Sequence, residues 1–158
     1  MNKLEPTYLR FVYDGLQKGV LSGENASGLP YGFIGIYEQE FQSSTPIYLR
    51  QERLGQLALW ALFKGAVSTN MASSILGISE ESTKELIATY SSWFNSPDSG
   101  KYQLYHERLR VYLLQKLKED ELQLLNERLI TYLAQAIKAK KEDESEHYAL
   151  QNMAFHLA

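Results

Sequence analysis

The sequence of 158 residues contains no cysteine. This absence excludes disulfides, thiolate metal sites and cysteine nucleophiles, and it is compatible with a reducing compartment. Long hydrophobic runs are also lacking, since an uncharged stretch such as 54–63 is far shorter than the roughly 20 apolar residues of a membrane helix. The N-terminus shows no signal-peptide pattern. We therefore expect a cytoplasmic protein that does not enter a membrane.

The standard catalytic signatures are absent as well. The sequence has no Gly-x-x-x-x-Gly-Lys-Ser/Thr loop and no Gly-x-Gly-x-x-Gly, His-Glu-x-x-His or Gly-x-Ser-x-Gly motif. The three histidines, His106, His147 and His156, are too scattered to predict a metal site, and we interpret His147 and His156 as helix-surface or packing residues. We expect no enzyme, no metal and no cofactor in this chain.

What is present is typical of an ordinary globular protein of one domain or two small ones. Hydrophobic residues make up 44% of the chain and charged residues 22%. The eleven Tyr, six Phe and two Trp are interpreted mainly as core and helix-packing residues. A net charge of −3 gives no general attraction to polyanions, so binding to nucleic acid would need a local basic patch.

Apolar periodicity predicts three helices in the first part of the chain. Their ranges are 6–18, 33–41 and 47–64. The segment 22–32 between the first two is rich in Gly, Ser, Asn and Pro and is predicted to be a loop.

The segment 67–115 is the most informative part of the sequence. Ser68 is placed to cap a short helix, Gly77 to end it, and Ser79 to cap a second helix that continues to about Trp93. This pattern predicts a helix-turn-helix.

Two short strand candidates, 93–94 and 102–104, then flank the turn-forming run 95–100. A hairpin of this kind after a helix-turn-helix is a wing. The predicted fold class is therefore mainly α, with a winged helix (helix-turn-helix plus small β-hairpin wing) flanked by helical segments.

Three more helices are predicted after the hairpin. The first contains Tyr105 to Leu113, and the second runs from Leu122 to Ile137 with Asp120 as N-cap and Gln123 placed for a capping box. The acidic run 142–146 opens the last one, where negative charge suits a helix N-terminus. Its apolar stripes suggest that further helices follow in the natural protein. The alternative is a terminal helix docked in a groove of its own domain.

The predicted second helix of the helix-turn-helix argues against a DNA reader. In a DNA-binding winged helix, this element enters the major groove with basic and amide side chains. Here it carries Glu80, Glu81 and Glu85 against one Lys84, and the wing offers Lys101 against Asp98. This surface should repel phosphate and serve a protein partner instead.

The order of these elements resembles the region of STAND-type signalling NTPases (the NACHT and NB-ARC group) from the helical lid through the winged helix to the start of the helical sensor repeats. Residues 8–16 and Leu29-Pro30-Tyr31-Gly32-Phe33-Ile34-Gly35-Ile36-Tyr37 are similar to the junction of lid and winged helix. Residues 102–113 resemble the segment in which a histidine followed by an acid opens the helix after the wing. Residues 148–157 are similar to the first sensor repeat.

This resemblance implies that His106 is a cofactor-binding residue, a sensor of nucleotide phosphate in the full-length protein. Glu107 stands where many relatives have Asp. An imidazole can donate a hydrogen bond to phosphate. The alternative is that His106 caps the helix or packs beside the wing. Because the family's phosphate-cradling loop and magnesium-binding acid are missing, ATP or ADP is expected only together with the missing NTPase domain.

The sequence thus predicts a non-catalytic regulatory and interaction module. Its segments would be 1–45, a helical lid remnant and linker; 46–117, a winged-helix domain; and 118–158, a helical hairpin that starts the repeats. Its expected partners are protein: the NTPase core and repeat domains of its own full-length chain, with an oligomer allowed. The alternatives are a winged-helix DNA-binding transcription regulator and a free-standing helical adaptor.

Overall fold

The computed structural model describes residues 32–158, so the helix predicted over 6–18 and the loop before Gly32 lie outside the described residues. This part of the chain contains seven α-helices, two short 3₁₀ helices and three short strands. The α-helices are α2 Gly32–Ser44, α3 Arg50–Leu62, α4 Thr69–Leu76, α5 Glu80–Thr89, α6 Glu107–Lys116, α7 Glu119–Ala139 and α8 Glu144–Leu157. The remaining elements are η2 Ile47–Leu49, η3 Ser91–Trp93, β1 Val67–Ser68, β2 Phe94–Asp98 and β3 Lys101–Leu104.

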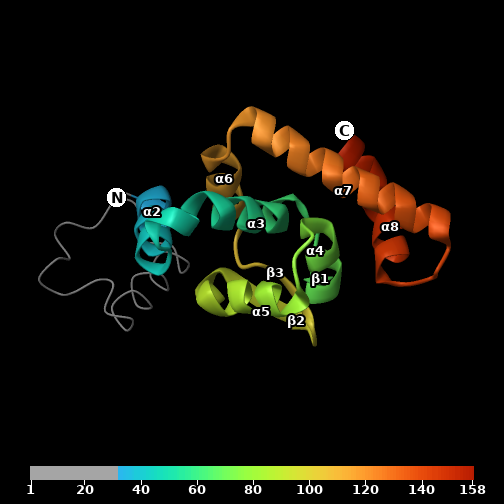
Figure 1. The fold of residues 1–158 in the computed structure, drawn as a ribbon, viewed down its shortest axis with the longest axis horizontal. Coiled ribbons are helices and arrows are strands. Elements are labelled where there is room, and N and C mark those ends of the chain that lie inside the picture. The colour runs from blue at the N-terminus through green and yellow to red at the C-terminus, as the bar shows by residue number, and fades with distance from the viewer. Residues whose placement is uncertain (1–31) are drawn as a thin grey trace, which may run out of the picture.

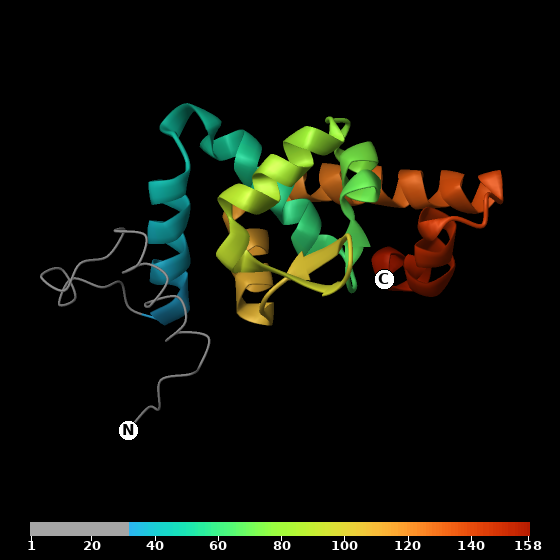
Figure 2. The same cartoon turned by 90° about the horizontal axis from the view of Figure 1, so that it is seen from below.

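Helix α3 lies at the centre of this arrangement (Figures 1 and 2). Helices α5 and α7 lie on opposite sides of it, α2 stands at one end, and the antiparallel pair α7–α8 extends beyond the other end. The fold is mainly helical with a small antiparallel sheet, as expected from the sequence.

The predicted pair of short helices is confirmed, with its caps. The Ser68 hydroxyl accepts the Met71 N–H, and Ser79 does the same for Ser82, so that each serine satisfies an otherwise unpaired amide of a first turn. Between them Gly77 ends α4 with φ of +70°, a left-handed conformation that glycine adopts without steric cost. Helix α5 ends at Thr89, earlier than predicted, because the chain leaves helical geometry at Tyr90 and continues as η3.

The predicted hairpin is present but longer than expected. Strand β2 continues through Asp98, so the predicted turn 95–100 is confined to its last residues. The sequence analysis missed β1, which pairs with β3 through Val67 and Tyr102 and completes a sheet of order β1-β3-β2. The start of α4 is thereby attached to the hairpin.

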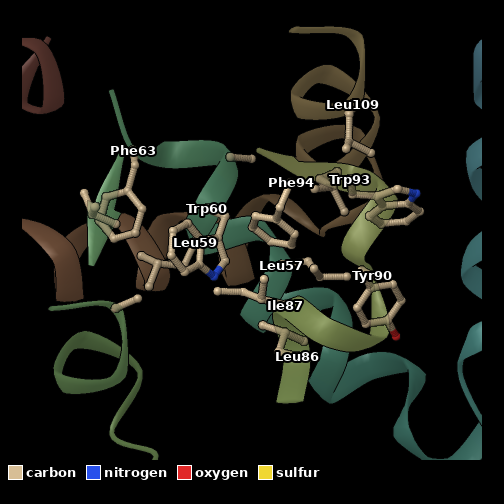
Figure 3. Close-up of a cluster of buried hydrophobic side chains, with 14 of the residues drawn as sticks. Leu57, Leu59, Trp60, Phe63, Leu86, Ile87, Tyr90, Trp93, Phe94 and Leu109 are labelled. Atoms are coloured by element: carbon tan, nitrogen blue, oxygen red, sulfur yellow. The ribbon is translucent and has the colours of Figure 1, made fainter. Parts of the chain in front are cut away.

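One buried hydrophobic cluster runs through the described residues. Aromatic rings form its centre: Trp60 meets Phe94 edge-on at 5.2 Å between centroids, and Trp93 lies 5.3 Å from Tyr90 (Figure 3). The cluster includes side chains from all α-helices between α2 and α8. The boundaries at 45 and 117 stay predictions, and the core is continuous across both of them.

The N-terminus of α7 differs from the prediction. Its N-cap is Lys118, two residues before Asp120, so the expected cap was wrong. The Glu121 carboxylate reaches back and accepts the Lys118 backbone N–H at 3.4 Å, which provides half of a capping box two residues earlier than the sequence suggested. Asp120 instead accepts the N–H of Glu121 at 3.0 Å.

Helix α8 docks on its own domain. Ala149 and Tyr148 are buried, and the Tyr148 hydroxyl accepts the Lys64 backbone N–H at 2.8 Å. Leu150 and Leu157 of α8 are exposed, whereas Met153 between them packs partly against the core. Among residues 32–158 no helix has the length and apolar character required to cross a bilayer.

Candidate functional site

The exposed side of α5 forms an acidic α5 surface, which we define by Glu80, Glu81 and Glu85. All three side chains are exposed, and so is Lys84. The Lys84 ammonium pairs with Glu80 at 3.8 Å, so the one positive charge is partly neutralised within the helix. The sequence-based expectation of a negatively charged second helix is therefore met by the geometry of the surface.

The start of α5 is held in a defined position. The Thr69 hydroxyl of α4 donates to Glu80 at 2.9 Å, and the buried Ser73 hydroxyl donates to Thr83 at 2.8 Å. These two contacts tie α5 to α4 across the turn. Negative charge at this helix terminus is also favoured by the helix dipole, so the acids stabilise α5 as well as setting its surface potential.

The hairpin adds little positive charge to this surface. Its Lys101 ammonium lies 4.0 Å from the Glu144 carboxylate of α8. The same Glu144 accepts the backbone N–H of Ser68 at 2.9 Å and the Ser68 hydroxyl. Lys101 is thus directed at α8, and Glu144 joins the hairpin, β1 and α8 at one point.

His106 lies where β3 gives way to α6. It is half-buried and is the N-cap of α6, and its Nδ1 accepts the Arg108 backbone N–H at 3.1 Å. The cap that was given as the alternative role of His106 is therefore present. With Nδ1 acting as acceptor, the neutral ring carries its proton on Nε2, the tautomer that can donate to an anion. Its role as a phosphate sensor stays a prediction.

The two other histidines differ from each other. His147 is exposed on α8, whereas His156 is buried and its Nε2 lies 2.8 Å from the Tyr148 hydroxyl. Burial lowers the pKa of His156 and raises that of Tyr148 to about 12. Their predicted roles as surface and packing residues are confirmed. Residues 32–158 hold no group of three or more His, Asp or Glu side chains suited to a metal ion.

Sequence analysis missed a groove of about 640 Å³ between α3 and α7, which we name the α3–α7 groove. Its apolar lining consists of Gly55, Leu76, Ile78, Leu117, Leu124 and Leu125. Leu124 is 66% exposed, and no side chain fills the space beside Gly55. The available signal was Leu124 itself, an apolar residue outside the stripe that α7 turns toward the core.

The rim of this groove is polar. Gln51 of α3 donates from its side-chain amide to both carboxylate oxygens of Glu121 on α7, each at 3.0 Å. Glu52 and Arg128 also line it, and the Arg128 guanidinium lies 3.5 Å from the Leu76 carbonyl oxygen. An apolar floor with a polar rim is the usual anatomy of a protein-binding surface.

No protein-family model matches this chain, and the searches of curated proteins and of solved structures also gave no match. The sites described above therefore rest on the sequence and on the geometry of residues 32–158.

Proposed function

We propose that this chain is a non-catalytic regulatory and protein-interaction module built on a winged-helix arrangement, of the kind that accompanies the NTPase of STAND-type signalling proteins. The acidic α5 surface is the observation that carries the proposal. Helices α4 and α5, followed by the β2–β3 hairpin with β1 on its edge, have the order of a winged helix. The second helix of that order is the one that reads DNA when a winged helix does so.

Electrostatics favour a protein partner for this module. Bringing Glu80, Glu81 and Glu85 against phosphates would remove water from carboxylates while adding repulsion between like charges. A basic protein surface would instead form ion pairs with the same side chains. The α3–α7 groove, which reaches Ile78 in the turn before α5, offers a second surface with an apolar floor.

His106 gives the proposal its link to a nucleotide. It sits at the N-terminus of α6, where backbone N–H groups and the helix dipole favour an anion, and its Nε2 can donate to a phosphate. ATP or ADP would be bound by an NTPase domain outside this chain. Changing the nucleotide would then shift the winged helix between two positions relative to that domain.

The test compares charge reversal on two helices. Random duplex DNA is titrated with the unmodified chain, with E80K/E81K/E85K on α5, and with E119K/D120K/E127K on α7, by fluorescence anisotropy at about 50 and 200 mM salt. Both triple variants change the net charge equally. We expect no sub-micromolar DNA binding by the unmodified chain. The α5 variant should gain more DNA affinity than the α7 variant, in a salt-sensitive manner, because only α5 would face the major groove of DNA.

Two outcomes would contradict the proposal. Sub-micromolar, salt-sensitive binding by the unmodified chain would favour the DNA-binding transcription regulator. Steady phosphate release from ATP by the purified chain would show that it is an enzyme. For His106, the variant H106N removes the imidazole but keeps a side chain that can cap α6. If H106N folds normally, a loss of nucleotide response in it would come from the missing imidazole and not from a missing cap.

A further inference from the structure

We propose that the face formed by η2, α3 and α7 is a self-association surface, through which two copies of this chain form a symmetric dimer. In this dimer, Ile47 and Tyr48 of each copy enter the α3–α7 groove of the other. The inference shares the α3–α7 groove with the proposed function and names its occupant, but it does not depend on the acidic α5 surface or on His106.

Ile47 and Tyr48 form an apolar projection at the corner between α2 and α3. Their exposed fractions are 79% and 84%, the highest of the large hydrophobic side chains whose exposure the structure describes. Two adjacent large apolar side chains exposed to this extent form a contiguous patch, and such patches mark interaction surfaces. The pair therefore calls for an apolar partner surface.

The corner that carries this projection is held firmly. The Leu49 N–H donates to the Pro46 carbonyl oxygen at 2.9 Å, and Thr45 contacts the buried Tyr90 hydroxyl. Arg50 donates to the carbonyl oxygens of Thr45 and Gln42, each at 3.2 Å. Little conformational entropy would be lost when this corner enters a groove.

The projection and the groove lie on the same side of the molecule. The Arg50 N–H donates to the Ile47 carbonyl oxygen, so η2 leads directly into α3. Tyr48 precedes Gln51 by three residues and Glu52 by four, the spacing that places side chains on one face of a helix. Gln51, Glu52 and Gly55 all line the groove. When a projection and a recess lie on one face, a two-fold axis can place the projection of each copy in the recess of the other. This is the condition for an isologous dimer.

Charge supports the same pairing. Arg50 stands beside the projection with its guanidinium on carbonyl oxygens, so its positive charge stays at the corner. The groove rim carries the carboxylates of Glu52 and Glu121 beside the guanidinium of Arg128, so two of its three charges are negative. Docking in the proposed way would bring the Arg50 of one copy toward the acidic rim of the other. Complementary charge of this kind orients the two copies more than it raises their affinity for each other.

The first experiment measures self-association of the full chain by sedimentation velocity from about 5 to 500 µM, a range suited to a weak interface. We expect a reversible monomer–dimer equilibrium. Y48E and L124E should each raise the dissociation constant at least about tenfold by placing a charge in the projection or in the groove. L150E is the matched control, because Leu150 is 63% exposed on α8, away from this face, and it should leave the equilibrium unchanged.

A second experiment tests the pairing itself. Because the chain has no cysteine, Y48C and L124C each introduce a single thiol, and a short bis-maleimide should join Y48C to L124C in a mixture. An equal mixture of Y48E and L124E should also dimerise more strongly than either alone, since the mixed pair keeps one intact contact.

A chain that stays monomeric over the whole concentration range overturns the proposal and leaves the groove to another protein. Dimers lost in L150E but kept in Y48E and L124E would overturn it in favour of an α8 interface. Species that grow beyond dimers would overturn the two-fold symmetry, because a head-to-tail contact does not close.

Discussion

The acidic α5 surface and the α3–α7 groove differ in the free energy that it takes to remove water from them. Carboxylates on α5 are strongly hydrated, and removing that water is costly unless a positive charge replaces it. The groove floor is mostly leucine, isoleucine and glycine, and covering it gains about 25 cal/mol per Å² of apolar area. A partner of α5 must therefore be basic, whereas a partner of the groove needs shape and apolar side chains.

Both surfaces lie on one hydrophobic core, and W93A should disrupt that core more than any other change proposed below. Trp93 is fully buried against Tyr90, Tyr37 and Tyr112. Removing its ring should lower the free energy of unfolding by about 3–5 kcal/mol and abolish both surfaces together. Urea unfolding followed by circular dichroism measures this loss.

The half-exposed Val111 on α6 provides the control for W93A, because V111A should change the free energy of unfolding by less than about 0.5 kcal/mol. If W93A unfolded in two separate steps, the two surfaces would belong to independent units.

Two glycines near the α3–α7 groove should respond oppositely to substitution, Gly77 in the turn before α5 and Gly55 within α3. Gly77, in the turn before α5, has φ of +70°, so G77A should destabilise the chain by about 1–2 kcal/mol. Gly55 lies inside α3 at the groove, with open space where a Cβ would stand, so G55A should stabilise it by about 0.5–1 kcal/mol. Thermal and urea unfolding of the two variants should shift in opposite directions. Shifts of the same sign would contradict the expected contrast between a left-handed and a helical glycine.

The smallest expected effect is a pH dependence located in α8, far from the acidic surface. Burial lowers the pKa of His156 below its ordinary value of 6.5, so between the two values the unfolded chain binds more protons than the folded one. Stability should therefore fall as the pH drops through 6.5 and change no further from this group once the folded form also titrates. Unfolding free energies measured at several pH values, with H156Q as control, test this. An unchanged slope in H156Q would contradict it.

A separate acid effect belongs to the α2–α6 contact. Burial alone would raise the pKa of Glu38, but hydrogen bonds from Tyr112, Lys116 and Gln42 outweigh it and hold the pKa below 4.5. The Tyr112 hydroxyl donates at 2.7 Å and the Lys116 ammonium lies at 3.0 Å. This contribution is present above about pH 4.5 and is lost as the pH falls through the lower folded value, whereas the His156 effect sets in as the pH drops through 6.5.

Local chemistry explains which elements could be predicted from the sequence. Ser68, Gly77 and Ser79 act on amides and carbonyls within four residues of themselves, so their pattern was sufficient to place α4 and α5. The start of α7 could not be placed from the sequence, because several acids stand in succession and the bond from the Lys118 backbone N–H to the Glu121 carboxylate depends on side-chain geometry.

Contacts distant in sequence could not be predicted. Glu144 meets Ser68 across 76 positions, and Gln51 meets Glu121 across 70. Neither pair leaves a periodic signal. Strand β1, with two residues, is too short for an alternating pattern. The groove arises where α3, α7 and the turn before α5 come together, so its existence depends on the assembled fold.

Ser68 serves three neighbours at once. It pairs with Lys101 in the sheet, accepts the Met71 N–H at the start of α4, and donates to Glu144 of α8. Undocking of α8 would therefore free the Ser68 hydroxyl to rotate. Its hydrogen bond to the first turn of α4 would become weaker, although α8 itself need not contact α4. The hydrogen-exchange rate of the Met71 amide would therefore report whether α8 is docked.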